Sequence, residues 1–140
     1  MAWLNPARAK IIQECLWDFA RLIPKEYTRQ AFHNALQTKV VELADEFNLK
    51  GIAEYYVHNW HKDGRVGLID VVWVDYGKPL IAFEIDAATR VKSIQKLLAF
   101  DASSRVWIYY GKRDVTNLLN EYDTDGLIHV FNMQGVRLFN

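Results

Sequence analysis

Hydrophobic positions in the first third of the chain recur every three to four residues, in two separate runs. In residues 7–23 the apolar side chains are spaced as on one face of a helix, and Asn5 and Pro6 can supply its cap and its first residue. A second helical stripe begins near Thr28 and ends before Gly51. Its members are Phe32, Leu36, Val40, Leu43 and Phe47. The pattern therefore predicts two amphipathic helices.

From residue 52 onward the pattern changes to that of β-strands. The runs 53–60, 66–75 and 80–86 are rich in β-branched and aromatic residues. Turn-forming residues at 62–64 and 76–79 separate them. Consecutive strands with short connections form antiparallel neighbours, so we expect a three-stranded meander.

The remainder of the chain alternates helical and strand-like segments. Residues 88–101 predict a helix with one apolar face, and residues 105–110 predict a compact strand. Asp114 can cap a further short helix, and residues 127–133 read as a last strand. At 140 residues the chain is the length of one domain. We expect a single α/β (α+β) domain with a central mixed sheet flanked by helices.

Three acidic residues stand out on the second and third strands of the meander. Asp70 interrupts an apolar strand, where aspartate is a poor residue. If the hairpin is centred on Gly77, Asp70 lies directly opposite Glu84, with Cβ atoms about 4.5–5.5 Å apart. Two like charges so close are destabilising unless a cation, such as a divalent metal ion, compensates them. Asp86 points to the same face as Glu84 and adds a third carboxylate.

The element order and these acids resemble those of the PD-(D/E)XK nuclease superfamily, whose restriction-endonuclease-like fold has an αβββαβ core. The resemblance covers about residues 28–111, after one extra N-terminal helix, and rests on an aspartate after Gly-x-x and on Glu-x-acid before a helix. It implies that Asp70, Glu84 and the backbone carbonyl of Ile85 bind Mg²⁺ or Mn²⁺. It also implies metal-dependent hydrolysis of phosphodiester bonds, with DNA as the favoured nucleic-acid partner.

Asp86 departs from the family pattern, because it occupies the position of the motif lysine. Some members of the family carry the basic residue on the next helix instead. Lys92 is our first candidate and Lys96 our second, since residues four apart share one helical face, and Arg90 is the third. Alternatively, the two lysines are ordinary solvent-exposed residues on one face of the helix.

Asp86 itself has three interpretations: a second-metal ligand, an acid favoured at a helix N-terminus, or a sign that catalysis has been lost. The last leads to a second hypothesis, a nuclease-like fold that no longer cuts and serves as a nucleic-acid-binding or protein-interaction module.

The second helix of the family often adds another acid. Glu42 is the best match, with Glu46 and Glu54 as alternatives, although each fits an ordinary surface glutamate.

Composition and charge narrow the class of protein. A content of 51% hydrophobic and 14% aromatic residues indicates a folded domain rather than a disordered chain. The net charge is +0, so any electrostatic footprint for nucleic acid must be local. The single cysteine, Cys15, excludes an intrachain disulfide. Charged residues within 7–23 exclude a signal peptide or membrane span, so we expect a cytoplasmic protein without a membrane partner. A homodimer would enlarge the surface available for DNA.

Overall fold

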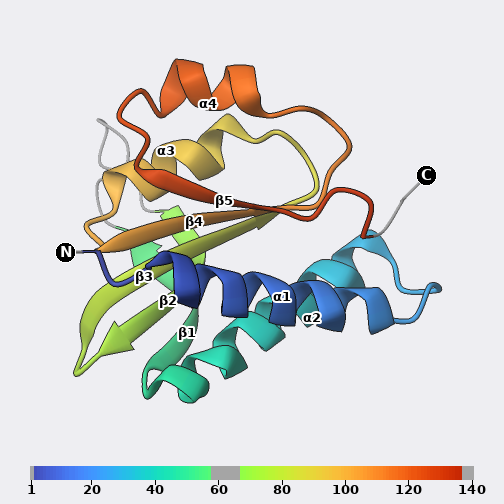
Figure 1. The fold of residues 1–140 in the computed structure, drawn as a ribbon, viewed down its shortest axis with the longest axis horizontal. Coiled ribbons are helices and arrows are strands. Elements are labelled where there is room, and N and C mark those ends of the chain that lie inside the picture. Colours follow the sequence, from blue (N-terminus) through green and yellow to red (C-terminus); the bar gives the residue numbers. More distant parts are fainter. Residues whose placement is uncertain (1, 58–66, 137–140) are drawn as a thin grey trace.

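Five strands form one mixed sheet with helices on both of its faces, in the computed structural model of the chain (Figure 1). The structure describes residues 2–57 and 67–136. Neighbouring strands follow the chain order across the sheet, antiparallel up to the third strand and parallel after it. The strands are β1 (Lys50–Val57), β2 (Gly67–Asp75), β3 (Lys78–Asp86), β4 (Ser104–Tyr109) and β5 (Ile128–Asn132).

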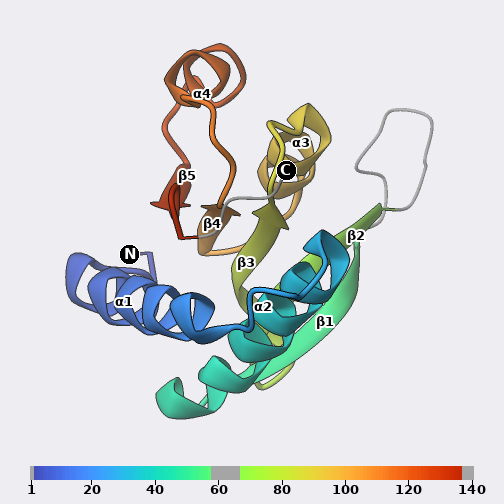
Figure 2. The ribbon, with the colours of Figure 1, turned by 90° about the vertical axis from the view of Figure 1, so that its right-hand side faces the viewer.

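Two helices lie on each face of the sheet (Figure 2). Within the described residues these are α1 (Pro6–Leu22) and α2 (Arg29–Leu43) on one face, and α3 (Val91–Ala99) and α4 (Thr116–Tyr122) on the other. A short 3-10 turn, η1 (Ala44–Phe47), follows α2. The α+β class, the meander and the mixed sheet flanked by helices are therefore confirmed.

Side-chain caps fix the N-terminal ends of the first two helices. Asn5 Oδ1 accepts a hydrogen bond from the Arg8 N–H at 2.8 Å, with Pro6 as the first helical residue. Thr28 Oγ1 accepts from the Ala31 N–H at 3.1 Å. Each cap satisfies a backbone donor that no helical carbonyl can reach. Both helices begin where the sequence pattern predicts.

The third helix begins three residues later than expected. Residues 87–90 form a bend instead of a first helical turn, with the Arg90 N–H donating to the Ala88 carbonyl at 2.9 Å. The helix starts at Val91 and ends at Ala99. The bend leaves the residues after β3 outside any helix, where they can line a cleft.

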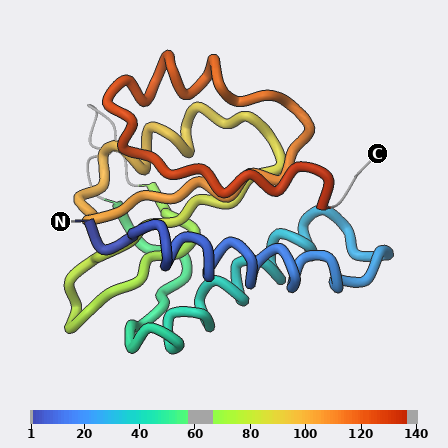
Figure 3. Tube along the Cα trace, viewed as in Figure 1, coloured from blue at the N-terminus to red at the C-terminus, as the bar shows by residue number. Residues whose placement is uncertain are grey.

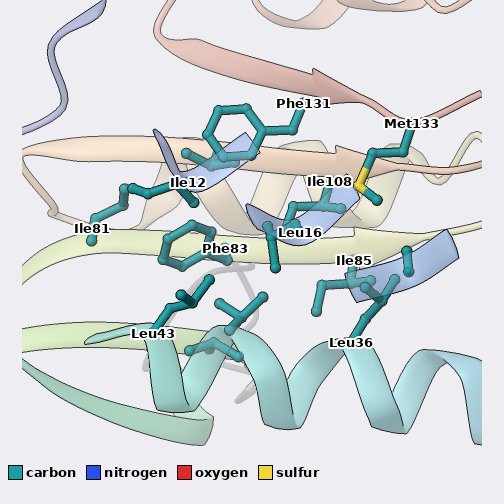
Figure 4. Close-up of a cluster of buried hydrophobic side chains, with 14 of the residues drawn as sticks. Ile12, Leu16, Leu36, Leu43, Ile81, Phe83, Ile85, Ile108, Phe131 and Met133 are labelled. Carbon is teal, nitrogen blue, oxygen red and sulfur yellow. The ribbon is translucent and has the colours of Figure 1, made fainter. Parts of the chain in front are cut away.

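Apolar residues of α1 and α2 pack against one face of the sheet and form the larger core (Figure 4). In β3 the odd-numbered residues Ile81, Phe83 and Ile85 point into this core. Because side chains alternate along a strand, the even-numbered Glu84 and Asp86 point to the opposite face, where α3 lies. Because side chains alternate along β3, its apolar residues and its acids lie on opposite faces of the sheet.

The hairpin between β2 and β3 turns more tightly than its sequence suggests. Tyr76 and Gly77 alone form the turn, with φ angles of 50° and 80°. Two successive positive φ angles are typical of the type I′ turn, which matches the twist of a hairpin. If the register of this two-residue turn continued unchanged along both strands, Asp70 would lie opposite Phe83 and not opposite an acid.

A β-bulge restores the expected register. The pairing of β2 and β3 shifts by one residue, so that Leu80 has no partner of its own. Beyond the bulge, Val71 pairs with Phe83. Asp70 is then level with Glu84. The register predicted from the sequence is therefore confirmed as far as the ladder runs, although a tight turn and a bulge produce it.

The chain termini and the connections complete the fold. Figure 3 shows the N-terminal segment beside the start of β4, where the Trp3 and Leu4 N–H groups donate to the hydroxyls of Ser103 and Ser104 at 2.9 Å. The expected turn at 62–64 and the end of the first predicted strand lie outside the described residues. Among residues 2–57 and 67–136, no helix combines the length and apolar character needed to cross a membrane.

Candidate active site

The site lies where β2 and β3 separate. Their ladder ends at the pair Val71–Phe83, while β3 continues alongside β4 up to Asp86 (Figure 2). Beyond that pair, carboxylates take the place of main-chain partners. Asp70 Oδ2 accepts from the Ile85 N–H at 2.8 Å, and the Asp70 N–H lies 3.4 Å from Glu84 Oε2. Both acids are therefore held at the fork by backbone groups.

Asp70 is also irregular on its β1 side. The β1–β2 ladder passes over Glu54 and Asp70, and Glu54 has a left-handed φ of 53°. Gln37 of α2 fills the gap, because its Nε2 donates to the Asp70 carbonyl at 2.9 Å and to Glu54 Oε1 at 3.0 Å. A helix on the other face of the sheet thus orients the backbone of Asp70.

The same helix brings a histidine to the carboxylate of Asp70. His33 Nε2 lies 3.8 Å from Asp70 Oδ1, and both side chains are about one-fifth exposed. Arg29, His33 and Gln37 are spaced four residues apart, so they share one face of α2. This polar stripe, flanking the predicted apolar one, was the signal for these residues, which the sequence reasoning missed.

On the α3 side, one of the predicted lysines reaches the acids. Lys96 Nζ lies 2.7 Å from Glu84 Oε1 and donates to the Leu68 carbonyl at 2.7 Å. Lys92 is exposed and does not line the cleft. Residues four apart differ by about 6 Å along a helix axis, so a carboxylate in contact with one need not lie near the other. Among the candidates on this helix, the geometry favours Lys96.

Asp86 is held by neighbours from β4 and from the start of α3. Its Oδ2 accepts from Trp107 Nε1 at 2.9 Å, and its Oδ1 lies 3.7 Å from Arg90 Nε. Burial raises the pKa of Asp86, opposed by its hydrogen bonds to Ser93 and Trp107. The residue in the place of the motif lysine therefore has structural partners of its own.

Glu84 is the most buried acid of the site. Only 2% of it is exposed, and its Oε1 lies 2.7 Å from the Lys96 ammonium. Burial raises the pKa of Glu84 well above its ordinary value, the Asp70 carboxylate raises it further, and Lys96 opposes both. A buried carboxylate beside a second one favours a proton or a cation.

We expect Glu84→Gln to stabilise the metal-free protein at neutral and higher pH. The raised pKa means that the folded state holds the proton more tightly than the unfolded one, so stability falls as pH rises through the folded-state pKa. Glutamine carries no charge, so the variant does not lose stability in this way. The loss in the wild type is about 1.4 kcal/mol of unfolding free energy for each unit by which the pKa is raised. Urea unfolding in EDTA at about pH 4 and about pH 8 measures it.

The stability difference between Glu84→Gln and the wild type should be small at about pH 4 and large at about pH 8. A variant that is less stable than the wild type at the higher pH would contradict the burial penalty assigned to Glu84.

A cleft of about 480 Å³ opens over these groups. Acids from β2 and β3 line it together with basic or polar residues from α2, from α3 and from the residue before α3. The charged and polar residues that line it are Arg29, Gln30, His33, Asp70, Glu84, Asp86, Arg90, Ser93 and Lys96. The backbone of Ile85 also belongs to the lining.

The accessory acids proposed from the sequence lie elsewhere. Glu42 and Glu46 are exposed and do not line the cleft. Glu54 is exposed as well and does not line the cleft, and Gln37 links it to the Asp70 carbonyl. The second helix therefore supplies basic and polar groups to the cleft, and not the acid that the family resemblance implied.

No family model, no curated protein and no solved structure matches the chain.

The donor set at the fork fits a hard divalent cation. Within the described residues, no ready-made group of three or more His, Cys, Asp and Glu side chains could hold a metal ion. Mg²⁺, however, commonly takes one or two carboxylates from a protein and completes its shell with waters and phosphate oxygens. Asp70 and Glu84 supply two carboxylates, and the Glu84 carboxylate is buried, with the Lys96 ammonium as its ion-pair partner. The site can thus hold half of such a shell.

Proposed function

We propose that this protein is a metal-dependent nuclease of the restriction-endonuclease-like fold that hydrolyses phosphodiester bonds in DNA. The observation that carries the proposal is the meeting of Asp70, Glu84 and Lys96 at the fork of two strands, with Lys96 Nζ 2.7 Å from Glu84 Oε1. An acid pair beside an ammonium can serve a metal ion and a phosphate at once. The order α2, β1, β2, β3, α3, β4 agrees with the core of that fold.

The proposed metal is Mg²⁺ or Mn²⁺, held by the carboxylates of Asp70 and Glu84 and by the backbone carbonyl of Ile85. Such an ion lowers the pKa of a water molecule and stabilises charge on the phosphate. Asp70 is suited to this role because the Ile85 N–H of β3 and the Gln37 side chain of α2 hold it in position. Its position then depends on the fold and not on the metal.

Lys96 is the proposed partner of the scissile phosphate or of the attacking water. The Leu68 carbonyl holds its ammonium at the mouth of the fork, within reach of Glu84. An ammonium is a compact point charge that binds phosphate oxygens well. Arg90 and His33 also line the cleft, where they add positive charge or hydrogen-bond donors.

Incubating plasmid DNA and single-stranded DNA with the protein and Mg²⁺ or Mn²⁺ tests the activity. We expect cleavage that stops on addition of EDTA. Calorimetric titration of metal-free protein tests the site separately, and the midpoint of thermal unfolding should rise with metal concentration, since a ligand of the folded state stabilises it. Absence of any metal affinity would rule out the proposal.

A second candidate function is a nuclease-like module that binds nucleic acid or protein without cutting. It is favoured by Asp86, which stands in the place of the motif lysine and is bound to the Trp107 indole. Binding of metal or DNA without turnover, under all of the conditions above, would select this second function.

A further inference from the structure

A second hollow adjoins the carboxylate cleft. It has a volume of about 400 Å³ and shares Arg29, Ala87, Ala88 and Tyr110 with the cleft. It lies at the carboxyl ends of the parallel strands β3 and β4, where the two following loops meet. Crevices at the carboxyl ends of parallel strands are frequent ligand sites.

The close approach of these two loops is a built feature. A Cβ atom at Gly111 would lie 2.2 Å from the Ala87 carbonyl oxygen, so only glycine allows the contact. The Tyr109 hydroxyl accepts from the Arg113 N–H at 2.9 Å, and Gln134 Nε2 donates to the Arg113 carbonyl at 2.8 Å. The backbone of the loop after β4 is thus fixed, while the Lys112 and Arg113 side chains are exposed.

The two hollows differ in the charge of their linings. The carboxylate cleft has three acids balanced by Arg29, Arg90 and Lys96, whereas the second hollow has Arg29, Lys112 and Arg113 and no acid. Asp114 is next in the sequence, but its Oδ1 accepts from the Thr116 N–H and it does not line the hollow. A cleft with acids and bases in its lining therefore adjoins, through the residues that the two share, a hollow whose charged residues are all basic.

We infer that the second hollow, formed around Lys112 and Arg113, binds the backbone phosphates of a DNA strand beyond the phosphate at the carboxylate pair. The inference rests on the proposed function and adds that the ligand is a polynucleotide and not a single nucleotide. Each nucleotide of a strand carries one phosphate, so a strand leaving the cleft needs cations further along its path. Arginine can bind phosphate with two parallel hydrogen bonds, and lysine adds a point charge.

Binding of a fluorescein-labelled single-stranded DNA of about 12 nucleotides, followed by anisotropy in EDTA and again in Ca²⁺, tests this inference without turnover. The control variant Lys50→Ala/Lys78→Ala removes the same charge as Lys112→Ala/Arg113→Ala. Its two lysines are exposed, and Lys78 begins β3 at the end opposite Asp86. We expect Lys112→Ala/Arg113→Ala to weaken binding about tenfold or more, because it removes two phosphate contacts.

The salt dependence of DNA binding shows whether the variant loses direct phosphate contacts or only positive net charge. Each phosphate contact on a single strand adds about 0.7 to the slope of log affinity against log salt, so losing two should lower the slope by about 1.4. Lys50→Ala/Lys78→Ala should leave it unchanged. Equal weakening in both variants, no binding by the wild type, or a mononucleotide that binds as tightly as the oligonucleotide would each overturn the inference.

The outcomes also separate this inference from the proposed function. Wild-type cleavage of DNA with unaltered binding by Lys112→Ala/Arg113→Ala removes the second hollow as a strand site and leaves the nuclease. Weakened binding by that variant, with a wild type that never cuts, keeps the strand site and leaves the non-cutting module as the function.

Discussion

Replacing Glu84 with glutamine should abolish Mg²⁺-dependent cleavage while the fold persists. The change removes one of two carboxylates at the fork and keeps the size of a side chain that is only 2% exposed. We expect the rate to fall about 10³-fold or more, since a bound metal contributes several kcal/mol of charge stabilisation. Initial rates of plasmid nicking measure the loss, and circular dichroism reports on the fold.

Glu42→Gln is the matched control for this variant. It makes the same chemical change on α2, at an exposed residue outside the cleft. Its rate should stay within about twofold of the wild type, as is usual for surface substitutions. If Glu84→Gln retained a rate comparable to that of the control, Glu84 would not be a metal ligand.

The second large effect should distinguish two lysines of the same helix. Lys96→Ala removes the ammonium that lies 2.7 Å from Glu84, whereas Lys92→Ala removes an exposed one. We expect Lys96→Ala to lower the rate about 10²- to 10³-fold, the range found when one donor to a developing charge is removed. Lys92→Ala should change it by no more than about twofold.

Lys96→Ala should also shift the pH dependence of metal binding. Lys96 lowers the pKa of Glu84, so its removal lets that pKa rise and metal must displace a more tightly held proton. Metal titrations at several pH values should therefore show tight binding only at higher pH in this variant. An equal loss of activity in Lys92→Ala, without such a shift, would return Lys92 to the role for which we first selected it.

Local patterns were sufficient for the elements and for the central acid pair. Asn5 and Thr28 are caps whose partners lie three residues away, so they act wherever the rest of the chain folds. Alternation in β3 places Glu84 opposite the apolar face, because neighbouring side chains of a strand always point apart. The position of Asp70 level with Glu84, one step beyond the last ladder pair, followed from two strands joined by a short turn.

Contacts between distant segments were beyond such patterns. Gln37 reaches the Asp70 carbonyl across 33 positions of sequence, and His33 reaches its carboxylate, only because the core packs α2 against the sheet. The accessory acid expected at Glu42 failed to reach the cleft for the same reason, since it lies on an exposed side of that helix. Packing, and not spacing, selects the face of α2 that meets the fork.

The sequence by itself determined the α+β class, the capped helices, the meander and the hairpin register that sets Asp70 level with Glu84, because caps, alternation and hairpin register act between near neighbours. Only the tertiary structure decided that a tight turn with a bulge produces that register, that Lys96 and not Lys92 meets Glu84, and that Gly111 brings two loops together beside the cleft. Each of these depends on ångström-scale distances between elements, which the close packing of the whole domain sets.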